Sequence, residues 1–279
     1  MKLTLGFSPC PNDTFIFDAM VHGRVDTEGI TFEYFLADVE ELNRRAMISA
    51  IDITKISYHA FAYVAQDYYI LDAGSALGYK NGPLVISKNK IDPDNFNSLH
   101  IAIPGKFTTA NLLMSIAWPN ATNKTEYLFS DIERAILEGE VDAGLIIHET
   151  RFTYQNKGLQ KFADMGEYWE RLTGLAIPLG SIVIKRNIPE NVALKVNRIL
   201  KRSIEYAYMD SLASYDFVSN NAKEMESKVM NRHIKLFVNE FTTNLGPDGR
   251  NAIKTLYSIA HEKNVIPELP EKIFLTEDL

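Results

Sequence analysis

The residues with the clearest capacity for chemistry lie in the stretch GLIIHETRFTY, residues 144–154 of the 279-residue chain. Its apolar run stops at His148, and a carboxylate, a hydroxyl and a guanidinium follow at Glu149, Thr150 and Arg151. A neutral imidazole can take a proton near pH 7, because its unperturbed pKa is about 6.5. If the strand continued, Glu149 and Arg151 would share one face and could pair, which would leave His148 on the other face. A satisfied surface loop and a site at the end of a core strand both fit this pattern.

A second polar stretch is SPCPNDT, residues 8–14, between a predicted strand and a predicted helix. Ser8 and Asn12 can cap the helix or bind a ligand. The same two interpretations stay open for Asp13 and Thr14. Cys10 is expected to be a packed small residue and not a nucleophile, because no Lys, Arg or His lies beside it in the sequence to lower its pKa.

The stretch PGKFTT, residues 104–109, joins a predicted strand to a predicted helix start. Backbone N–H groups and the helix dipole at such a start favour an anion, for example a carboxylate. The spacing of a phosphate-binding Walker loop is absent. From the sequence alone, Thr108 is more simply explained as a helix cap.

A lysine inside the apolar run DITKIS, residues 52–57, is unusual, because burying an unpaired ammonium group is costly. The stem of Lys55 either reaches the surface or faces a polar cleft. Spacing alone favours the first interpretation, in which the ammonium group of Lys55 reaches the surface.

No metal site is expected, because HExxH and related ligand spacings are absent. The remaining histidines stand in helical or loop contexts without convergent partners: His22, His59, His100, His233 and His261.

Composition excludes several classes of protein. The chain is 46% hydrophobic and 23% charged, with a net charge of −7, which argues against general nucleic-acid binding. A single cysteine permits no intrachain disulfide. No segment approaches the ~20 apolar residues of a membrane span. The N-terminus, MKLTLGFSPCPND, lacks the apolar stretch of a secretory signal, so a reduced, cytoplasmic location is expected.

Strands and helices are predicted to alternate, in two blocks separated by a polar break at residues 92–98. The predicted strands are residues 2–7, 30–35, 51–56, 84–87, 99–103, 141–147 and 182–185, and the predicted helices are 14–21, 38–48, 58–65, 108–117 and 130–139. Residues 38–41 have the form of a capping box, with Asp38 as the predicted cap of its helix. Mostly helices follow Pro189 and are expected to pack back on the first block. Such alternation predicts an α/β protein with sheets flanked by helices. We expect a larger discontinuous lobe of residues 1–90 and 180–279, a smaller lobe of residues 91–179, and a cleft between them.

Six stretches stand in order across the first two thirds of the chain: LGFSPCPNDTFIFDA, DITKISYHAFA, ALGYKNGPLV, IPGKFTTANLL, GEVDAGLIIHETRFTY and GLAIPLGSIVI. Together they closely resemble the 1,4-dihydroxy-6-naphthoate synthases of the futalosine route to menaquinone. That family resembles type 2 periplasmic binding proteins in fold, which implies two lobes with mixed sheets around a central cleft. One departure is Tyr79–Gly82, where the family carries smaller, glycine-rich residues, so the lining of that side of the pocket stays open.

The resemblance implies that the protein cleaves cyclic dehypoxanthine futalosine to 1,4-dihydroxy-6-naphthoate and a dihydroxyacetone fragment, with no metal or organic cofactor. The expected partner is a small-molecule carboxylate substrate, and no obligatory protein partner is evident from the sequence. The implied catalytic base is His148. The implied substrate-binding residues are Lys55, Ile56, Ser57, Thr108 and Thr109. The polar stretches described above add Ser8, Asn12 and Arg151 as further candidates.

Two alternatives stay open at this point. The first is chorismate dehydratase, an enzyme of the same fold and pathway. The second is a solute-binding protein that captures a small acid without turnover, since fold-level analogy does not separate a binding protein from an enzyme.

Overall fold

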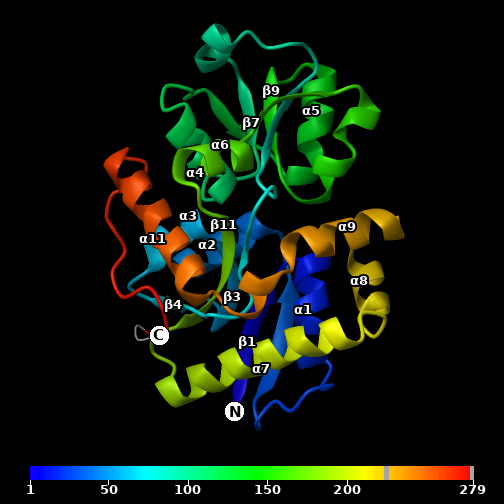
Figure 1. Ribbon diagram of the computed structural model, residues 1–279, viewed down its shortest axis with the longest axis vertical. Coiled ribbons are helices and arrows are strands. Elements are labelled where there is room, and N and C mark those ends of the chain that lie inside the picture. The colour runs from blue at the N-terminus through cyan, green and yellow to red at the C-terminus, as the bar shows by residue number, and fades with distance from the viewer. Residues whose placement is uncertain (223–225, 277–279) are drawn as a thin grey trace.

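Two mixed β-sheets, each flanked by helices, form the protein, and Figure 1 shows them one above the other. The computed structural model describes residues 1–222 and 226–276, apart from the side chain of Glu149. The predicted α/β architecture with two mixed sheets is confirmed.

The larger sheet contains the start of the chain. Its strands are β1 (Lys2–Phe7), β2 (Thr31–Leu36), β3 (Ile53–Ser57), β4 (Tyr68–Ile70), β5 (Ala76–Gly78) and β11 (Ile177–Lys185). The order is β2-β1-β3-β11-β4, with β5 also paired to β11. β1 is parallel to β2 and β3, so these strands share one carboxyl edge, whereas β11 runs antiparallel to its neighbours. That carboxyl edge faces the other sheet, since the N-terminus of β1 lies at the far end of the molecule (Figure 1).

The smaller sheet has the order β10-β6-β9-β7-β8. Its strands are β6 (Leu84–Ser87), β7 (Ile101–Ile103), β8 (Lys124–Glu126), β9 (Ala143–Ile146) and β10 (Gln160–Asp164). β7 is parallel to β8 and β9, and β6 is antiparallel to β9 and β10. The strand at residues 84–87 therefore pairs in the smaller sheet. We propose that the first crossing between the lobes lies just before it, and not at residue 90.

Helices cover both sheets and begin mostly where the sequence predicts. Those of the first two thirds are α1 (Pro11–Val21), α2 (Val39–Met47), α3 (Tyr58–Val64), α4 (Thr109–Ala117), α5 (Ile132–Glu138) and α6 (Met165–Thr173). The predicted caps at two starts are confirmed: Asp38 accepts the N–H groups of the first turn of α2, and Thr108 accepts the Asn111 N–H in α4. α1 starts three residues earlier than expected, because Pro11 occupies its first position, where the missing N–H does no harm.

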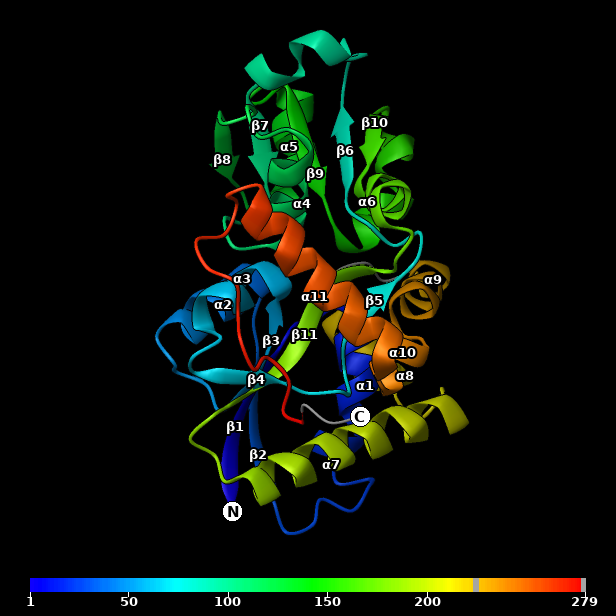
Figure 2. The ribbon, with the colours of Figure 1, turned by 60° about the vertical axis from the view of Figure 1, so that its left-hand side comes forward.

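The C-terminal helices pack against the larger lobe as expected. They are α7 (Glu190–Met209), α8 (Tyr215–Asn221), α9 (Ser227–Phe237), α10 (Glu240–Thr243) and α11 (Gly246–Glu262). α7 lies against α1, while α11 runs beside β11 and also reaches α4 (Figure 2). No helix in the described ranges is long and apolar enough to cross a membrane.

Candidate active site

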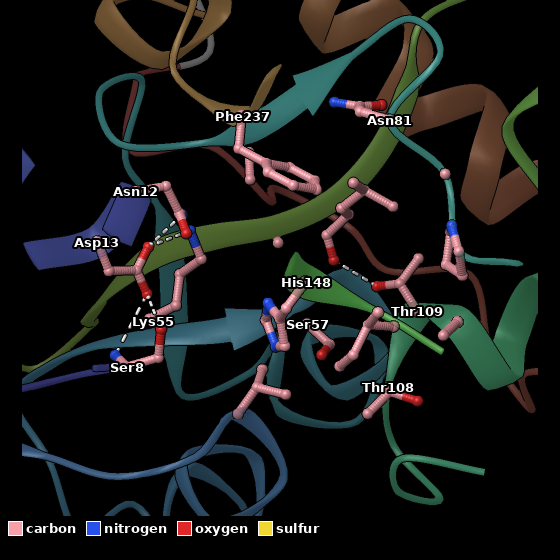
Figure 3. A pocket seen from close by; sticks show the side chains of 18 of the residues that line it. Ser8, Asn12, Asp13, Lys55, Ser57, Asn81, Thr108, Thr109, His148 and Phe237 are labelled. Atoms are coloured by element: carbon pink, nitrogen blue, oxygen red, sulfur yellow. Dashed lines mark hydrogen bonds and ion pairs between the residues drawn. The ribbon is translucent and has the colours of Figure 1, made fainter. Parts of the chain in front are cut away.

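A single pocket collects most of the candidate residues, and it lies where the carboxyl ends of β1, β3 and β9 face the start of α4 (Figure 3). Its walls enclose about 700 Å³, including the mouth that opens to solvent. Ligands of open α/β sheets typically bind beyond the carboxyl ends of strands, and this pocket has that placement.

His148 lines this pocket, but its local structure differs from a continued strand. β9 ends at Ile146, and His148–Phe152 forms a 3-10 helix. The backbone of His148 has φ = +60°, in the left-handed region that non-glycine residues rarely adopt. Such a conformation costs folding free energy and persists where the surroundings enforce it, often at functional sites. The strain marks His148 as a residue held in place by its neighbours.

Several side chains among the described residues lie close to the His148 ring. Its Nδ1 lies 3.5 Å from the Cys10 Sγ, which is a hydrogen-bond distance for sulfur. Phe129 meets the ring edge-on, with 4.9 Å between centroids. His233 lies nearly parallel to it, at 6.2 Å. Cys10 is buried as predicted, yet it contacts a histidine 138 residues away, which sequence neighbours did not reveal.

The prediction that the other histidines lack convergent partners is wrong for His233. This residue on α9 is fully buried, and its Nε2 lies 2.9 Å from Asn12 Oδ1. Asn12 Nδ2 donates to the carboxylate of Asp13, so Asn12 Oδ1 is the acceptor and His233 Nε2 carries the proton. Burial lowers the pKa of His233 well below its usual value, and nearby basic groups, including Lys55, add to the effect. His233 is therefore a neutral donor that orients Asn12.

Lys55 does not reach the outer surface, so the interpretation favoured by spacing alone is wrong. Its side chain lines the pocket and the residue is only 6% exposed. Lys55 Nζ donates to Asp13 Oδ1 at 3.1 Å. The other carboxylate oxygen of Asp13 accepts the Ser8 hydroxyl at 2.7 Å and the Ser8 N–H at 3.2 Å. Figure 3 shows this cluster of Ser8, Asn12, Asp13 and Lys55 on one side of the pocket.

The paired threonines also line the pocket, but their hydroxyl protons are committed to the protein. Thr108 Oγ1 donates to the Gly105 carbonyl at 2.8 Å. Thr109 Oγ1 donates to the Leu179 carbonyl at 2.6 Å. His59, another histidine expected to lack partners, donates from Nδ1 to the Thr108 carbonyl at 3.2 Å. The Thr109 hydroxyl therefore ties the helix start to the larger lobe, whereas the Thr108 hydroxyl closes the loop that precedes the helix.

What the start of α4 offers a ligand is therefore its backbone. Thr109 and Ala110 occupy the first positions of the helix and line the pocket. First-turn N–H groups have no acceptor within their own helix. Together with the helix dipole, they favour a bound anion.

Of the three remaining predicted residues, two line the pocket and one does not. Ser57 lines the pocket, whereas Ile56 is fully buried in the hydrophobic core on the opposite face of β3. Arg151 also lines the pocket, donates to the Gly82 carbonyl and lies 3.5 Å from an Asp164 carboxylate oxygen. The predicted pairing of Arg151 with Glu149 concerns a side chain outside the described residues.

Beside the pocket, Glu40 of α2 connects the two lobes. Its carboxylate accepts the Phe107 N–H, with a shortest distance of 3.2 Å, although the residue is only 7% exposed. The backbone of Gly105 packs so closely that an added Cβ would lie 2.5 Å from Glu40 Oε2. Burial raises the pKa of Glu40 from its usual 4.5 to about 7, with a smaller contribution from the nearby Glu126.

Replacing Glu40 with glutamine is expected to stabilise the protein above neutral pH and to have little effect in acid. Below pH 4.5 the carboxyl is protonated in both the folded and the unfolded chain, so ionisation carries no penalty. Between pH 4.5 and about 7 the unfolded chain loses this proton first, and the stability of the wild-type protein falls as pH rises. The gain in the free energy of unfolding at pH 8 should be on the order of 3 kcal/mol.

Urea unfolding of both proteins between pH 4 and 8 measures this difference. A stability difference that stays constant across that range would contradict the assignment of a raised pKa to Glu40.

Within the described part of the chain, no group of three or more His, Cys, Asp or Glu side chains could hold a metal ion. The residues that gather at the pocket are instead an imidazole, a paired ammonium and a helix start. Such a set can bind an organic acid and move a proton.

Comparison with known proteins gives matches along nearly the whole chain. A family model described as "Menaquinone biosynthesis" matches residues 3–262. A protein of Thermus thermophilus named 1,4-dihydroxy-6-naphthoate synthase is 38% identical over 273 residues, covering 98% of this chain and 99% of the relative. A protein of Streptomyces coelicolor with the same name is 41% identical over 273 residues, covering 96% and 95%.

Solved structures agree on the fold. A crystal structure of a protein from Archaeoglobus fulgidus has a TM-score of 0.90 and 34% identity, covering 95% of this chain and 98% of that one. The alkanesulfonate-binding protein SsuA from Xanthomonas axonopodis, bound to MOPS, has a TM-score of 0.73 and 13% identity, covering 96% of both chains. The second similarity shows a shared periplasmic-binding-protein fold and nothing about the ligand.

Proposed function

Because the chain belongs to the 1,4-dihydroxy-6-naphthoate synthase family of menaquinone biosynthesis, we propose that it cleaves cyclic dehypoxanthine futalosine with His148 as the general base. The chain is accordingly an enzyme, a lyase. The proposed products are 1,4-dihydroxy-6-naphthoate and dihydroxyacetone. The observation that carries the proposal is that His148 shares one pocket with Lys55 and the start of α4.

The proposed chemistry needs a base in an enclosed site. Breaking a carbon–carbon bond and aromatising a ring requires the removal of protons that neighbouring carbonyl groups have made acidic. An imidazole is suited to this near pH 7, and exclusion of water strengthens its interactions with the substrate. The contacts from Cys10 and Phe129 support the orientation of the His148 ring that this role requires.

Two features support binding of a carboxylate. The first-turn N–H groups of Thr109 and Ala110 form an anion-binding start of a helix. Lys55 has three ammonium donors, of which one is used by Asp13, so others can reach a negatively charged oxygen in the pocket. We propose that the substrate carboxylate binds at the start of α4. Lys55 would stabilise the negative charge that develops on the substrate as bonds break.

Contacts between the lobes favour a closed form of the pocket. Thr109 donates to Leu179 of the larger sheet, and Phe107 donates to Glu40 of α2. Entry of the substrate would require these bonds to open, and their closure would exclude water during reaction. The absence of a cofactor and a cytoplasmic location remain predictions from the sequence.

A direct assay of turnover tests the proposed function. Purified protein with cyclic dehypoxanthine futalosine should yield naphthoate and dihydroxyacetone in equal amounts, followed by absorbance and mass spectrometry. Turnover of chorismate in place of this substrate would identify a chorismate dehydratase. Tight binding without products would identify a solute-binding protein.

A further inference from the structure

Asn81 is a buried amide that the protein itself does not satisfy. The residue is 1% exposed, and neither Nδ2 nor Oδ1 has a hydrogen-bond partner among the described residues. Buried polar groups in folded proteins almost always find partners, because leaving one unpaired costs folding free energy. Both ends of this side chain therefore need an explanation.

The place of Asn81 suggests one. It lies between β5 and β6, where the chain crosses from the larger to the smaller sheet, and it lines the pocket. Figure 3 shows it across the pocket from the Asp13–Lys55 pair. Its amide packs against the backbone of Gly78, where an added Cβ would lie 2.9 Å from Asn81 Nδ2. The amide is thus confined to the pocket wall.

Neighbouring polar side chains are engaged elsewhere. Asn239 donates to the Leu77 carbonyl and accepts the Phe241 N–H. Arg151 donates to the Gly82 carbonyl and pairs with Asp164. A modest movement of these groups toward Asn81 would break existing bonds, so a ligand is the simplest partner for its amide.

We propose that Asn81 recognises the three-carbon fragment that the reaction releases as the hydroxyketone dihydroxyacetone, an inference that rests on the proposed function. An amide presents an N–H donor and a carbonyl acceptor side by side. A ketone oxygen accepts from Nδ2, and an adjacent hydroxyl donates to Oδ1. A carboxylate would satisfy only Nδ2, because it has no proton to donate. Asn81 thus orients the leaving fragment, while the carboxylate lies at the start of α4.

A pair of asparagine variants tests whether the Asn81 amide is functional or structural. Asn43 is the matched control, since it is fully buried but donates to Glu40 and Ser57 and accepts the Ser57 N–H. In ligand-free protein, Asn81→Leu should raise the melting temperature by about 2 °C or more, whereas Asn43→Leu should lower it. A decrease for Asn81→Leu similar to that of the control would show a structural amide and overturn the proposal.

Binding and kinetics test the ligand. Two lost hydrogen bonds predict a fall of kcat/KM for cyclic dehypoxanthine futalosine of about 10- to 100-fold in Asn81→Leu. Asn81→Ala, which cannot clash, should show the same loss. The Kd of 1,4-dihydroxy-6-naphthoate should stay within about twofold of the wild-type value, because this product lacks the hydroxyketone fragment.

Other outcomes are also decisive. An unchanged kcat/KM, or an equal loss of affinity for the aromatic product, would overturn the assignment of Asn81. No turnover by the wild-type protein would instead refute the proposed function and the hydroxyketone assignment with it, whatever the melting temperatures show.

Discussion

Replacing His148 with asparagine is expected to lower kcat by about 10²–10⁴-fold, which is the usual contribution of a general base. Asparagine tolerates the left-handed backbone conformation that His148 adopts at φ = +60°, so the variant should keep its fold. Its amide cannot accept a proton from carbon. Steady-state production of naphthoate measures the loss, and circular dichroism measures the fold.

His100→Asn is the matched control for this substitution. His100 also hydrogen-bonds through its ring, to Thr125, but it stands at the start of β7 and does not line the pocket. Its variant should keep wild-type turnover. Equal activity in the His148 and His100 variants would show that His148 is not the general base.

The second large effect is expected on stability, at the buried pair of Asp13 and Lys55. Asp13→Leu leaves the Lys55 ammonium buried without the partner it has in the wild-type protein, and breaking a buried pair typically costs about 3–5 kcal/mol. Lys55→Met should cost less, because the Asp13 carboxylate keeps its bonds from Ser8 and Asn12. Urea unfolding of the two variants gives both values.

The double variant Asp13→Leu/Lys55→Met separates pairing from packing. If the penalty of Asp13→Leu is that of an unpaired charge, removing Lys55 as well should recover much of the stability. Activity should stay low, since the ammonium group assigned to the substrate is gone. A double variant whose loss equals the sum of the single losses would refute the coupling of the pair.

Local sequence signals predicted the framework of the site well. Asp38 and Thr108 were predicted as helix caps, and each makes a bond to the first turn of its helix. Such signals depend on residues within a few positions of one another, so they can be read without the fold. The order of strands and helices likewise placed His148 and Lys55 at strand ends.

Interactions between distant residues could not be predicted. Lys55 is buried because Asp13, 42 positions earlier, supplies a carboxylate. His233 reaches Asn12 across 221 positions, and its place on a helix gave no hint of a partner. The left-handed backbone of His148 had no signal in the residues beside it, which favoured a continued strand. In each case tertiary contacts overrode what local spacing favoured.

The Asn81 segment shows a different limit. The sequence marked residues 79–82 as a departure from related proteins, which was a useful signal. It could not show that the amide is buried in the pocket wall without a partner, since burial depends on the crossing between the two sheets.

A crystal structure of the His148→Asn variant with cyclic dehypoxanthine futalosine tests the central claim most directly. The substrate should lie in the pocket with its carboxylate on the N–H groups of Thr109 and Ala110. The residue 148 side chain should lie within about 3.5 Å of the carbon or hydroxyl that loses the proton. A substrate bound elsewhere, or one whose reacting atoms are beyond the reach of residue 148, would contradict the account.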